Sequence, residues 1–550
     1  MKDVLVIGSG ISGMSCAVRC AELGLNVTLV SPFPSERSQS VMAAGGINAV
    51  LEDNGEGDSV LCHIEDTLRG GGYLASEEEV KGLCERSSEI LRFLERIGTV
   101  FSVDEDGRSA KRAFGGQSHK RTYYCGASTG KQIVSSLIME VRHFEAAGKI
   151  TRRLWSCFHS GLIIDGVCYG ALVYDETTRR LGTIYADAVV MATGGQNTLF
   201  GKTTGSTQCD GYAQGQLFRQ GAELKNLEFI QYHPTTLVTG QKHMLISEAA
   251  RGEGGRLFYM ENGKRVYFME DKYGEKGNLM TRDVVSREMF LVKKDVWLDV
   301  SFLGEELIRR RIPEVMELCR KYRGIDISKE PIPVTPSVHF FMGGFAVGPD
   351  HETNIRNLFA VGECASRYHG ANRLGGNSLL AAIYGGMTAA EEIAGRTGES
   401  RHPDFSEYAA KQAQVLEKKG KTESRFPVAY IRDLLAETMQ KDLGIVRNEG
   451  SLDNGITDVD YYLENADRIQ YDNSVMPYFN YSLTGILTLA RAVLTCAKNR
   501  RESRGAHYRS DYPEMKEEYA SSTIISYDDG VYRTRPEGNV GTSINTERCI

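Results

Sequence analysis

The sequence predicts an α/β protein whose first domain is a parallel sheet covered by helices. An apolar run at residues 4–7 enters a glycine-rich turn, and a helical pattern at 14–21 and a second apolar run at 25–30 follow. Two later apolar runs, at 186–192 and 357–361, have the length and composition of buried parallel strands. With 550 residues the chain exceeds one hydrophobic core, so we expect about two to four domains.

The turn after the first strand carries the pattern G-x-G-x-x-G. Gly8, Gly10 and Gly13 supply the glycines, and Ser12 lies between them. Glycine allows a tight turn and lets a pyrophosphate approach the N-terminus of the following helix, where free N–H groups favour an anion. Because strand, turn, helix and strand follow in the required order, the sequence predicts a Rossmann-like dinucleotide site.

The end of the second strand departs from this pattern. An Asp or Glu usually stands there and holds the ribose hydroxyls, but this chain has Ser31. A serine hydroxyl can also bond a ribose. Nucleotide binding is therefore still expected, and the ribose contact stays open.

Two later segments favour FAD over NAD as the nucleotide. One strand ends in Thr193, Gly194 and Gly195, and it resembles the turn at which flavoprotein sheets close over FAD. The other strand is followed by Gly362 and Glu363, and in the FAD proteins that it resembles the acid meets the ribityl chain. Each segment alone could be an ordinary strand end, but their order behind the first strand favours FAD.

Residues 369–380 have the character of an anion site. His369 and Arg373 stand among small residues, and an apolar run that predicts a buried helix follows directly. A guanidinium fork matches a carboxylate, and a helix N-terminus favours an anion. A glycine-rich connection with a surface arginine is the alternative that this segment alone leaves open.

Composition excludes several classes of function. A net charge of −7 without a basic block argues against nucleic-acid binding. No apolar run approaches the roughly 18–20 residues that span a bilayer, and a strand that begins at Val4 predicts no targeting peptide. The 12 cysteines are dispersed without C-x-x-C pairs. This predicts no metal or iron–sulfur site in the chain and a reducing cytoplasm.

Six motifs in one order resemble the flavoprotein subunit of fumarate reductase and succinate dehydrogenase, with L-aspartate oxidase as a close relative. The motifs span residues 231–235 (QYHPT), 247–255 (SEAARGEGG), 281–285 (TRDVV), 339–344 (HFFMGG), 369–373 (HGANR) and 501–507 (RESRGAH), the last resembling the family's C-terminal helical region. The resemblance runs from Met1 to about Pro513. It implies further FAD contacts at Ser38, Gln39, Ala44, Gly45, Gly46, Asp210, Asn377, Ser378 and Leu379. An Asp-Gly turn is the alternative for Asp210.

The resemblance implies a substrate site for a small dicarboxylate. Such a substrate needs cationic or hydrogen-bonding groups at both ends. Arg373 and His339 are implied to hold one carboxylate, and His233 and Ser247 the other. Most relatives carry threonine where Ser247 stands, so the hydroxyl is kept.

The resemblance also implies how the substrate receives its proton. Arg282 matches the family's proton donor, and Glu248 and Arg251 match the relay that leads to it from solvent. Their i, i+3 spacing predicts that Glu248 and Arg251 share one face of a helix. A surface ion pair is the alternative for these two residues.

Two positions discriminate among family members. Phe114 stands where aspartate oxidases carry an acid that can meet the substrate's ammonium, so a plain dicarboxylate is favoured over aspartate. Gln39 stands where membrane-linked relatives carry the histidine that is covalently joined to FAD. Glutamine cannot form this bond, so non-covalent FAD and fumarate reduction are favoured. The competing interpretations are L-aspartate oxidase, a reductase of another unsaturated acid, and a non-catalytic FAD-binding subunit.

The predicted fold is α/β: a Rossmann-like FAD-binding domain with an inserted α+β capping domain and a C-terminal helical domain. The FAD-binding domain is expected over residues 1–230 and 345–395, and the capping domain over 231–344. The helical domain is expected over 396–512, with helices at 404–419 and 483–498, because both segments are long and lack proline. The polar tail, 513–550, is expected to form an extended arm.

The chain has no haem-attachment or cluster motif, so its electrons must come from outside it. An iron–sulfur subunit is the partner that the resemblance implies, and a free-standing reductase is the alternative. We expect a cytoplasmic protein, with association at the inner face of the membrane through partner subunits.

Overall fold

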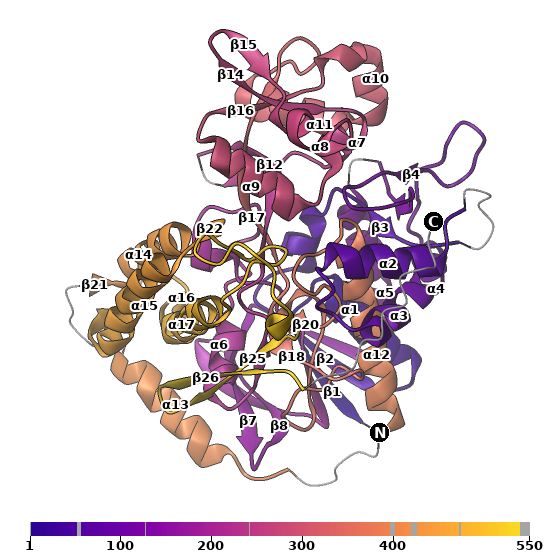
Figure 1. Cartoon of the computed structure of the whole chain (residues 1–550). Helices are drawn as coiled ribbons and strands as arrows, with labels where there is room; N and C mark the ends of the chain where they lie inside the picture. The colour runs from indigo at the N-terminus through magenta and orange to yellow at the C-terminus, as the bar shows by residue number, and fades with distance from the viewer. Residues whose placement is uncertain are drawn as a thin grey trace.

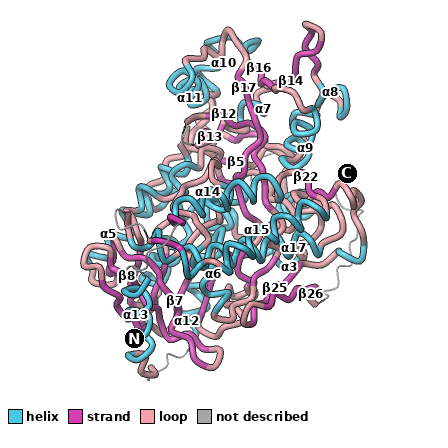
Figure 2. The backbone as a smooth tube through the Cα atoms, turned by 90° about the vertical axis from the view of Figure 1, so that its left-hand side faces the viewer, coloured by secondary structure: helices cyan, strands magenta, loops and turns pink. Residues whose placement is uncertain are grey.

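A computed structural model of the chain describes residues 2–51, 57–126, 128–240, 242–396, 402–419, 426–471 and 475–538. The structure has three parts. The N-terminal sheet and its helices form the base, the segment between β12 and β17 stands at one end of the molecule, and the C-terminal helices pack along one side (Figure 1). The view turned by 90° shows the same end placement (Figure 2).

The base is built on a five-stranded parallel sheet in the order β19-β10-β1-β2-β6. Its strands are β1 (Asp3–Ile7), β2 (Asn26–Ser31), β6 (Ile150–Leu154), β10 (Ala188–Met191) and β19 (Leu358–Ala360). The three inner strands predicted from apolar runs, β1, β2 and β10, are almost fully buried. The α/β class expected from these runs is confirmed.

Helices α1 (Ile11–Glu22), α5 (Thr129–Ala146) and α12 (Asn377–Gly395) cover the sheet. Two glycines set how closely these elements approach. A Cβ at Gly13 would lie 1.9 Å from the carbonyl oxygen of Gly8, and one at Gly386 would lie 2.6 Å from that of Ser12. Side chains at these two positions would push α1 off the turn and α12 off α1.

Smaller elements surround this core. They are α2 (Val60–Gly70), α3 (Glu77–Glu85), α4 (Ser87–Arg96), β3 (Ile47–Asn48), β4 (Lys111–Arg112), β5 (Thr122–Tyr123), β7 (Ser156–Ile164), β8 (Val167–Asp175), β9 (Arg180–Tyr185) and α6 (Tyr212–Arg219). Strands β3 and β5 pair, so the loop after β2 is held close to the segment that carries Phe114.

The segment between β12 (Ile230–Val238) and β17 (Ile332–Phe341) forms its own six-stranded sheet, ordered β13-β12-β17-β16-β14-β15. The other elements are β13 (His243–Leu245), α7 (Ala249–Gly252), β14 (Arg256–Glu261), β15 (Lys264–Val266), α8 (Phe268–Tyr273), α9 (Arg282–Val292), β16 (Val296–Asp299), α10 (Gly304–Arg311) and α11 (Pro313–Arg323). The segment has an apolar core of its own. We call it the cap; β12 and β17 connect it to the base.

The C-terminal part contains the helices α13 (Ser406–Lys419), α14 (Val428–Asp442), α15 (Glu449–Glu464), α16 (Pro477–Tyr481) and α17 (Leu483–Asn499). The helices expected at 404–419 and 483–498 are therefore present. The motif at 501–507 is not helical: it forms an irregular segment closed by a bridge between Arg504 and His507. Glu502 and Arg504 of this segment are buried in an ion pair, whereas Arg501 is exposed.

The expectation of an extended arm after Pro513 is wrong. Residues in this tail form the hairpin β25 (Thr523–Asp528) and β26 (Val531–Pro536), and β25 pairs with β11 (Leu224–Lys225) of the base. Ile524 and Ile525 are buried at this pairing, so the tail is part of the hydrophobic core. Residues 539–550, with Cys549, lie outside the described residues.

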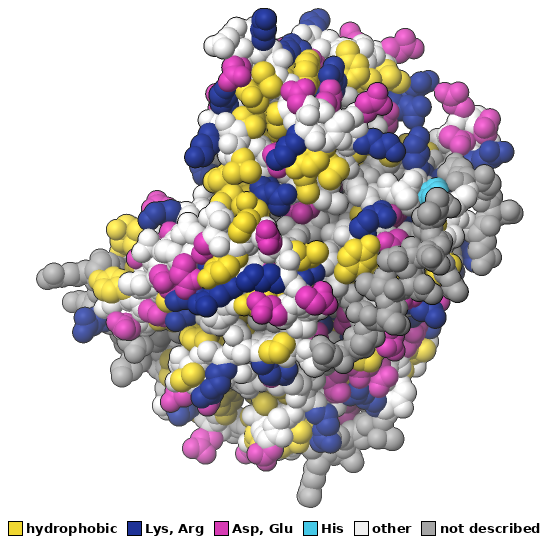
Figure 3. Space-filling view, viewed as in Figure 1, with side chains coloured by type: hydrophobic (Ala, Val, Ile, Leu, Met, Phe, Trp, Pro, Cys, Tyr) yellow, Lys and Arg dark blue, Asp and Glu magenta, His cyan; other side chains and the backbone are white. Residues whose placement is uncertain are grey.

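In the described part of the chain, no helix combines the length and the apolar character that crossing a membrane demands. On the face drawn in Figure 3, Lys and Arg side chains alternate with Asp and Glu side chains. No single basic patch dominates that face.

Candidate active site

One elongated cavity lies where the base, the glycine-rich turn and the cap meet. It is lined by the predicted cofactor residues Gly8, Gly10, Ser12, Ser31, Ser38, Gln39, Ala44, Gly45, Gly46, Thr193, Gly194, Asp210, Glu363, Ser378 and Leu379. The predicted substrate and catalytic residues His233, Ser247, Glu248, Arg282, His339 and Arg373 line the same cavity. Base and cap therefore contribute to one site.

Four predicted residues do not line it. Gly13 and Gly195 pack behind the wall, and a Cβ at Gly195 would lie 2.6 Å from Glu363 Oε1. The Asn377 side chain is held by others, with its Oδ1 atom 2.7 Å from Asn48 Nδ2 and 2.9 Å from His63 Nε2. Arg251 lies behind Glu248. The structure thus gives these residues packing and support contacts rather than places in the wall.

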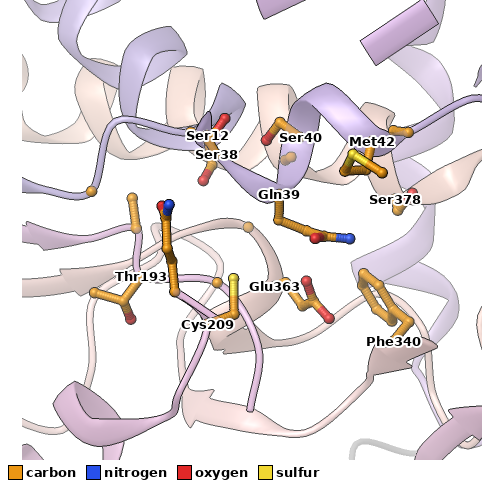
Figure 4. Close-up of a pocket in the computed structure, with 18 of the residues that line it drawn as sticks. Ser12, Ser38, Gln39, Ser40, Met42, Thr193, Cys209, Phe340, Glu363 and Ser378 are labelled. Atoms are coloured by element: carbon orange, nitrogen blue, oxygen red, sulfur yellow. The ribbon is translucent and has the colours of Figure 1, made fainter. Parts of the chain in front are cut away.

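The wall offers polar groups that fit a flavin nucleotide. Ser38 Oγ and Gln39 Oε1 are buried there without a hydrogen-bond partner in the described chain. Gln39 extends from one wall toward Glu363 on the other, with Thr193 and Cys209 also on that other wall (Figure 4). Burial raises the pKa of Glu363 to about 7, and the backbone N–H of Phe341 donates to it at 3.1 Å.

The ends of two helices face the same cavity. Helix α1 begins after Gly10 and α12 after Gly376, and neither N-cap residue supplies a side-chain hydrogen bond. Such helix ends favour phosphate and other anions. Ser31, the departure noted in the sequence, donates to the Phe33 carbonyl and receives a 2.8 Å bond from Ser9 Oγ. Its hydroxyl already has two protein partners.

Two guanidinium groups from different parts of the chain meet at Gln231. Arg282 Nη1 and Arg373 Nη2 each lie 3.1 Å from Gln231 Oε1. The amide nitrogen of Gln231 donates to Asn372 Oδ1 at 2.7 Å and to the Arg373 carbonyl at 2.8 Å. Gln231, on β12, therefore orients an arginine of α9 and an arginine of the base at once.

Arg282 is paired with a carboxylate that supports its charge. Its Nε and Nη2 atoms donate to Glu248 Oε2 at 2.8 and 2.6 Å, and Arg251 Nη2 lies 3.4 Å from Glu248 Oε1. Although burial opposes it, the two guanidinium groups hold the pKa of Glu248 at about 2. Arg251, Glu248 and Arg282 therefore contact one another in this order, and all three side chains are buried, so Glu248 and Arg251 do not form a surface ion pair.

Arg373 has no carboxylate partner among the described residues. It is 3% exposed, its Nε atom has no hydrogen-bond partner, and its guanidinium lies 4.4 Å from the centre of the Phe340 ring. Burial, and next the charge of Arg282, hold the pKa of Arg373 well below its usual value. A buried cation without a counterion is costly unless an anion joins it. The geometry therefore calls for an anion at Arg373.

Two histidines stand beside the arginines. His233 on β12 and His339 on β17 have ring centres 5.1 Å apart. Burial lowers the pKa of both imidazoles well below the usual value; a second cause is Arg282 for His233 and the His233 ring for His339. Both rings are neutral at pH 7. His233 Nδ1 lies 3.1 Å from the Thr235 carbonyl oxygen and 3.3 Å from the Thr235 backbone nitrogen, so the backbone of Thr235 orients this ring.

Comparisons with known proteins decide the family. Residues 3–379 match the model of an FAD binding domain, and residues 432–537 match that of the fumarate reductase flavoprotein C-term. A succinate dehydrogenase flavoprotein subunit of Bacillus subtilis is 37% identical and covers 96% of this chain and 94% of its own. A fumarate reductase flavoprotein subunit of Haemophilus influenzae is 33% identical over 96% of this chain and 92% of its own. The chain belongs to the succinate dehydrogenase/fumarate reductase flavoprotein family.

Solved structures agree with this assignment. A quinol–fumarate reductase with menaquinol molecules matches with a TM-score of 0.92 and 30% identity over 99% of both chains. Adenylylsulfate reductase from Archaeoglobus fulgidus shares the fold at a TM-score of 0.79 with 17% identity. The chain is thus an oxidoreductase with FAD as its cofactor, as the sequence predicted. The C-terminal match extends to residue 537, beyond the expected end near Pro513.

Sequence reasoning missed two residues at this site, Gln231 and Phe340. Gln231 opens the QYHPT motif, but its contacts come from segments distant in sequence, so the motif gives it no separate role. Phe340 lines the cavity, and its ring lies 5.4 Å from that of His369, which the sequence analysis had already singled out beside Arg373. The position of Phe340 inside the HFFMGG motif is the signal that could have found it.

Proposed function

We propose that this flavoprotein interconverts fumarate and succinate and works mainly as a fumarate reductase. The single observation that carries the proposal is Arg373, a buried guanidinium with no carboxylate partner in the described chain, beside Arg282, which has one. One uncompensated cation at the base, facing two neutral imidazoles and a serine from the cap, suits a dianion held at both ends. The B. subtilis and H. influenzae relatives carry the names of both directions of this reaction.

The residues proposed to bind the substrate come from both the base and the cap. Arg373 and His339 hold one carboxylate, and His233 and Ser247 hold the other. Arg373 comes from the base, whereas the other three come from the cap or its connecting strands. The binding set is therefore complete only with the cap against the base, which also excludes water.

FAD in its reduced form, when bound, would supply the hydride that adds to one alkene carbon and would itself become oxidised. Arg282 gives a proton to the other carbon, so fumarate takes up one hydride and one proton to become succinate. Glu248 stays ionised at pH 7 because its pKa is about 2, and it keeps Arg282 oriented by two hydrogen bonds. Arg251 contacts the other carboxylate oxygen of Glu248. The proton that Arg282 gives up is replaced along the row Arg251, Glu248 and Arg282.

The nature of the substrate is tested by one dye-coupled assay with three substrates. Fumarate should oxidise the reduced dye, succinate should reduce an oxidised dye more slowly, and aspartate should give no peroxide in air. Phe114 lines the cavity where an acid would be needed for an ammonium group, which is why aspartate should fail. Turnover only with aspartate, or only with another unsaturated acid, would replace the proposal by that reaction.

The FAD is proposed to be non-covalent, because Gln39 stands at the position where a covalent link would require histidine. Acid precipitation of the purified protein should leave a colourless pellet and a yellow supernatant. Yellow colour that remains in the pellet would refute the proposal. A Gln39→Ala variant should release its FAD as completely as the wild-type protein does. This control separates a lost hydrogen bond to FAD from a covalent link to FAD.

We also propose that the electron-transfer partner is an iron–sulfur subunit, with association at the inner face of the membrane through partners of the chain. Support comes from a similar solved structure, which is a quinol–fumarate reductase with menaquinol molecules. Co-purification of the tagged chain from its native cells should recover a protein with a cluster absorption spectrum. Isolation of the active chain alone would favour a free-standing reductase.

A further inference from the structure

A separate cluster of ligand-type side chains lies beside a loop that contacts the active site. Asp58, Cys62 and His119 each present one atom, and the three atoms lie within 4.8 Å of one another. His119 belongs to the loop 114–121, in which the Gly115 N–H donates to Glu248 Oε1 at 2.8 Å. The three side chains do not line the cavity described above. The sequence does not indicate a metal site here. Asp58 and Cys62 lie close together at the start of α2, but His119 comes from a distant loop.

The local charges favour a cation. Arg121 is fully buried and donates to Asp58 at 2.8 and 3.1 Å and to Asp66 at 2.6 Å. One buried guanidinium therefore faces two buried carboxylates. Arg69 also contacts Asp66, but half of its side chain is exposed, so water and salt screen its charge. Loss of the Cys62 proton would add a further negative charge, and a divalent cation would offset it.

The ligand atoms are held in place by neighbouring contacts. Cys62 lies in the first turn of α2, where the Ser59 hydroxyl accepts its backbone N–H at 3.1 Å. Ser118 Oγ lies 3.0 Å from His119 Nδ1, and the Ser118 N–H donates to Asp66 at 2.7 Å. The His119 side chain is 32% exposed, which leaves a path for an ion from solvent.

We propose that Asp58, Cys62 and His119 bind a thiophilic divalent cation of the Zn²⁺ class. Thiolate sulfur, imidazole nitrogen and carboxylate oxygen are the ligands that zinc takes, and three protein ligands leave a fourth position for water. Binding releases the thiol proton of Cys62. The cation would join the start of α2 to the loop 114–121. The site is independent of the proposed reaction, so either proposal can fail without the other.

The test is a titration of the purified FAD-loaded protein with Cd²⁺, followed by the ultraviolet charge-transfer band of a cadmium thiolate. We expect a band that saturates at one equivalent and is displaced by Zn²⁺. Cys62→Ser should abolish the band. His119→Gln should weaken Zn²⁺ binding at least about tenfold, since even residues outside the ligand shell often have effects of that size.

Matched controls separate this site from other thiols and histidines. Every other cysteine in the described chain is buried, and Cys549 lies beyond it, so Cys549→Ser must keep the band. His143→Gln, at an exposed helical position, must keep wild-type Zn²⁺ affinity. Bound FAD and circular dichroism show that each variant is folded. A band that survives in Cys62→Ser, or wild-type Zn²⁺ affinity in His119→Gln, overturns the proposal.

Discussion

The two buried arginines of the cavity differ in one respect, and the proposed chemistry depends on it. Arg282 is neutralised by Glu248, whereas Arg373 is not paired with any carboxylate of the described chain. A substrate carboxylate therefore gains most at Arg373, where it completes a charge pair already removed from water. Arg282 is instead held by two hydrogen bonds to Glu248, and it is the residue proposed to give the substrate its proton.

At the residue scale, Arg282→Lys should lower turnover by about 10²-fold or more, the usual contribution of a positioned proton donor. Lysine keeps the charge but cannot reach Glu248 and Gln231 with three separate N–H groups, as Arg282 does. The measurement is kcat for fumarate at full FAD occupancy. Arg287→Lys, on the same helix but outside the cavity, should stay near wild type. Near-normal turnover in Arg282→Lys would refute the proton-donor role.

At the scale of elements, β1, α1 and the turn between them act as one unit. Gly8 has a φ of 115°, which side chains other than glycine rarely adopt, and Gly13 brings α1 against the Gly8 carbonyl. The predicted cofactor residues Gly8, Gly10 and Ser12 owe their positions to this packing. The nucleotide end of the cavity is therefore built by local sequence.

Gly13→Ala tests this unit. Its Cβ would lie 1.9 Å from the Gly8 carbonyl oxygen, so α1 must shift, at a cost of about 1–3 kcal/mol in stability. We expect a lower melting temperature and substoichiometric FAD by absorbance. Gly395→Ala is the matched control, because it is also a helical glycine and has nothing within 4 Å of the added atom. Full FAD content and an unchanged melting temperature in Gly13→Ala would contradict the argument.

At the scale of the whole molecule, the C-terminal segment supports the loop that carries Arg373. Glu502 accepts from Arg500 at 2.7 Å and from Arg504 at 2.9 and 3.1 Å, and all three side chains are buried. Arg504 donates to the Gly72 carbonyl at 2.8 Å, and the Ala506 N–H donates to Ala371 at 2.9 Å. The irregular 501–507 segment thus braces the loop that carries Arg373.

Glu502→Gln should destabilise the protein by about 3–5 kcal/mol, because it leaves the buried guanidinium group of Arg504 without a carboxylate, whereas Arg500 keeps Glu228. Thermal unfolding of the FAD-loaded protein measures the change. Glu518→Gln removes only an exposed partner of Lys516 and should change stability by less than about 0.5 kcal/mol. Equal melting temperatures for the two variants would show that the buried network contributes little.

Much of the fold could be predicted because its signals are local. Glycine spacing and apolar runs predicted the α/β class and a dinucleotide site, and the resemblance of short motifs indicated FAD and the family. The α/β class, the cofactor and the family are confirmed. The roles of individual site residues stay predictions, although the structure gathers most of them around one cavity. Asn377 shows the limit: its side chain bonds to Asn48 and His63 rather than lining the wall.

The sequence by itself determined which residue types stand in each strand, turn and motif. Only the tertiary structure decided that Gln231 joins Arg282 to Arg373, that Arg373 lacks a carboxylate in the described chain, and that the tail adds strands to the base. The physical reason is the distance along the sequence over which each property is determined. Backbone conformation and burial pattern follow from neighbouring residues, whereas the charge balance of a buried group depends on side chains from segments far apart in the chain.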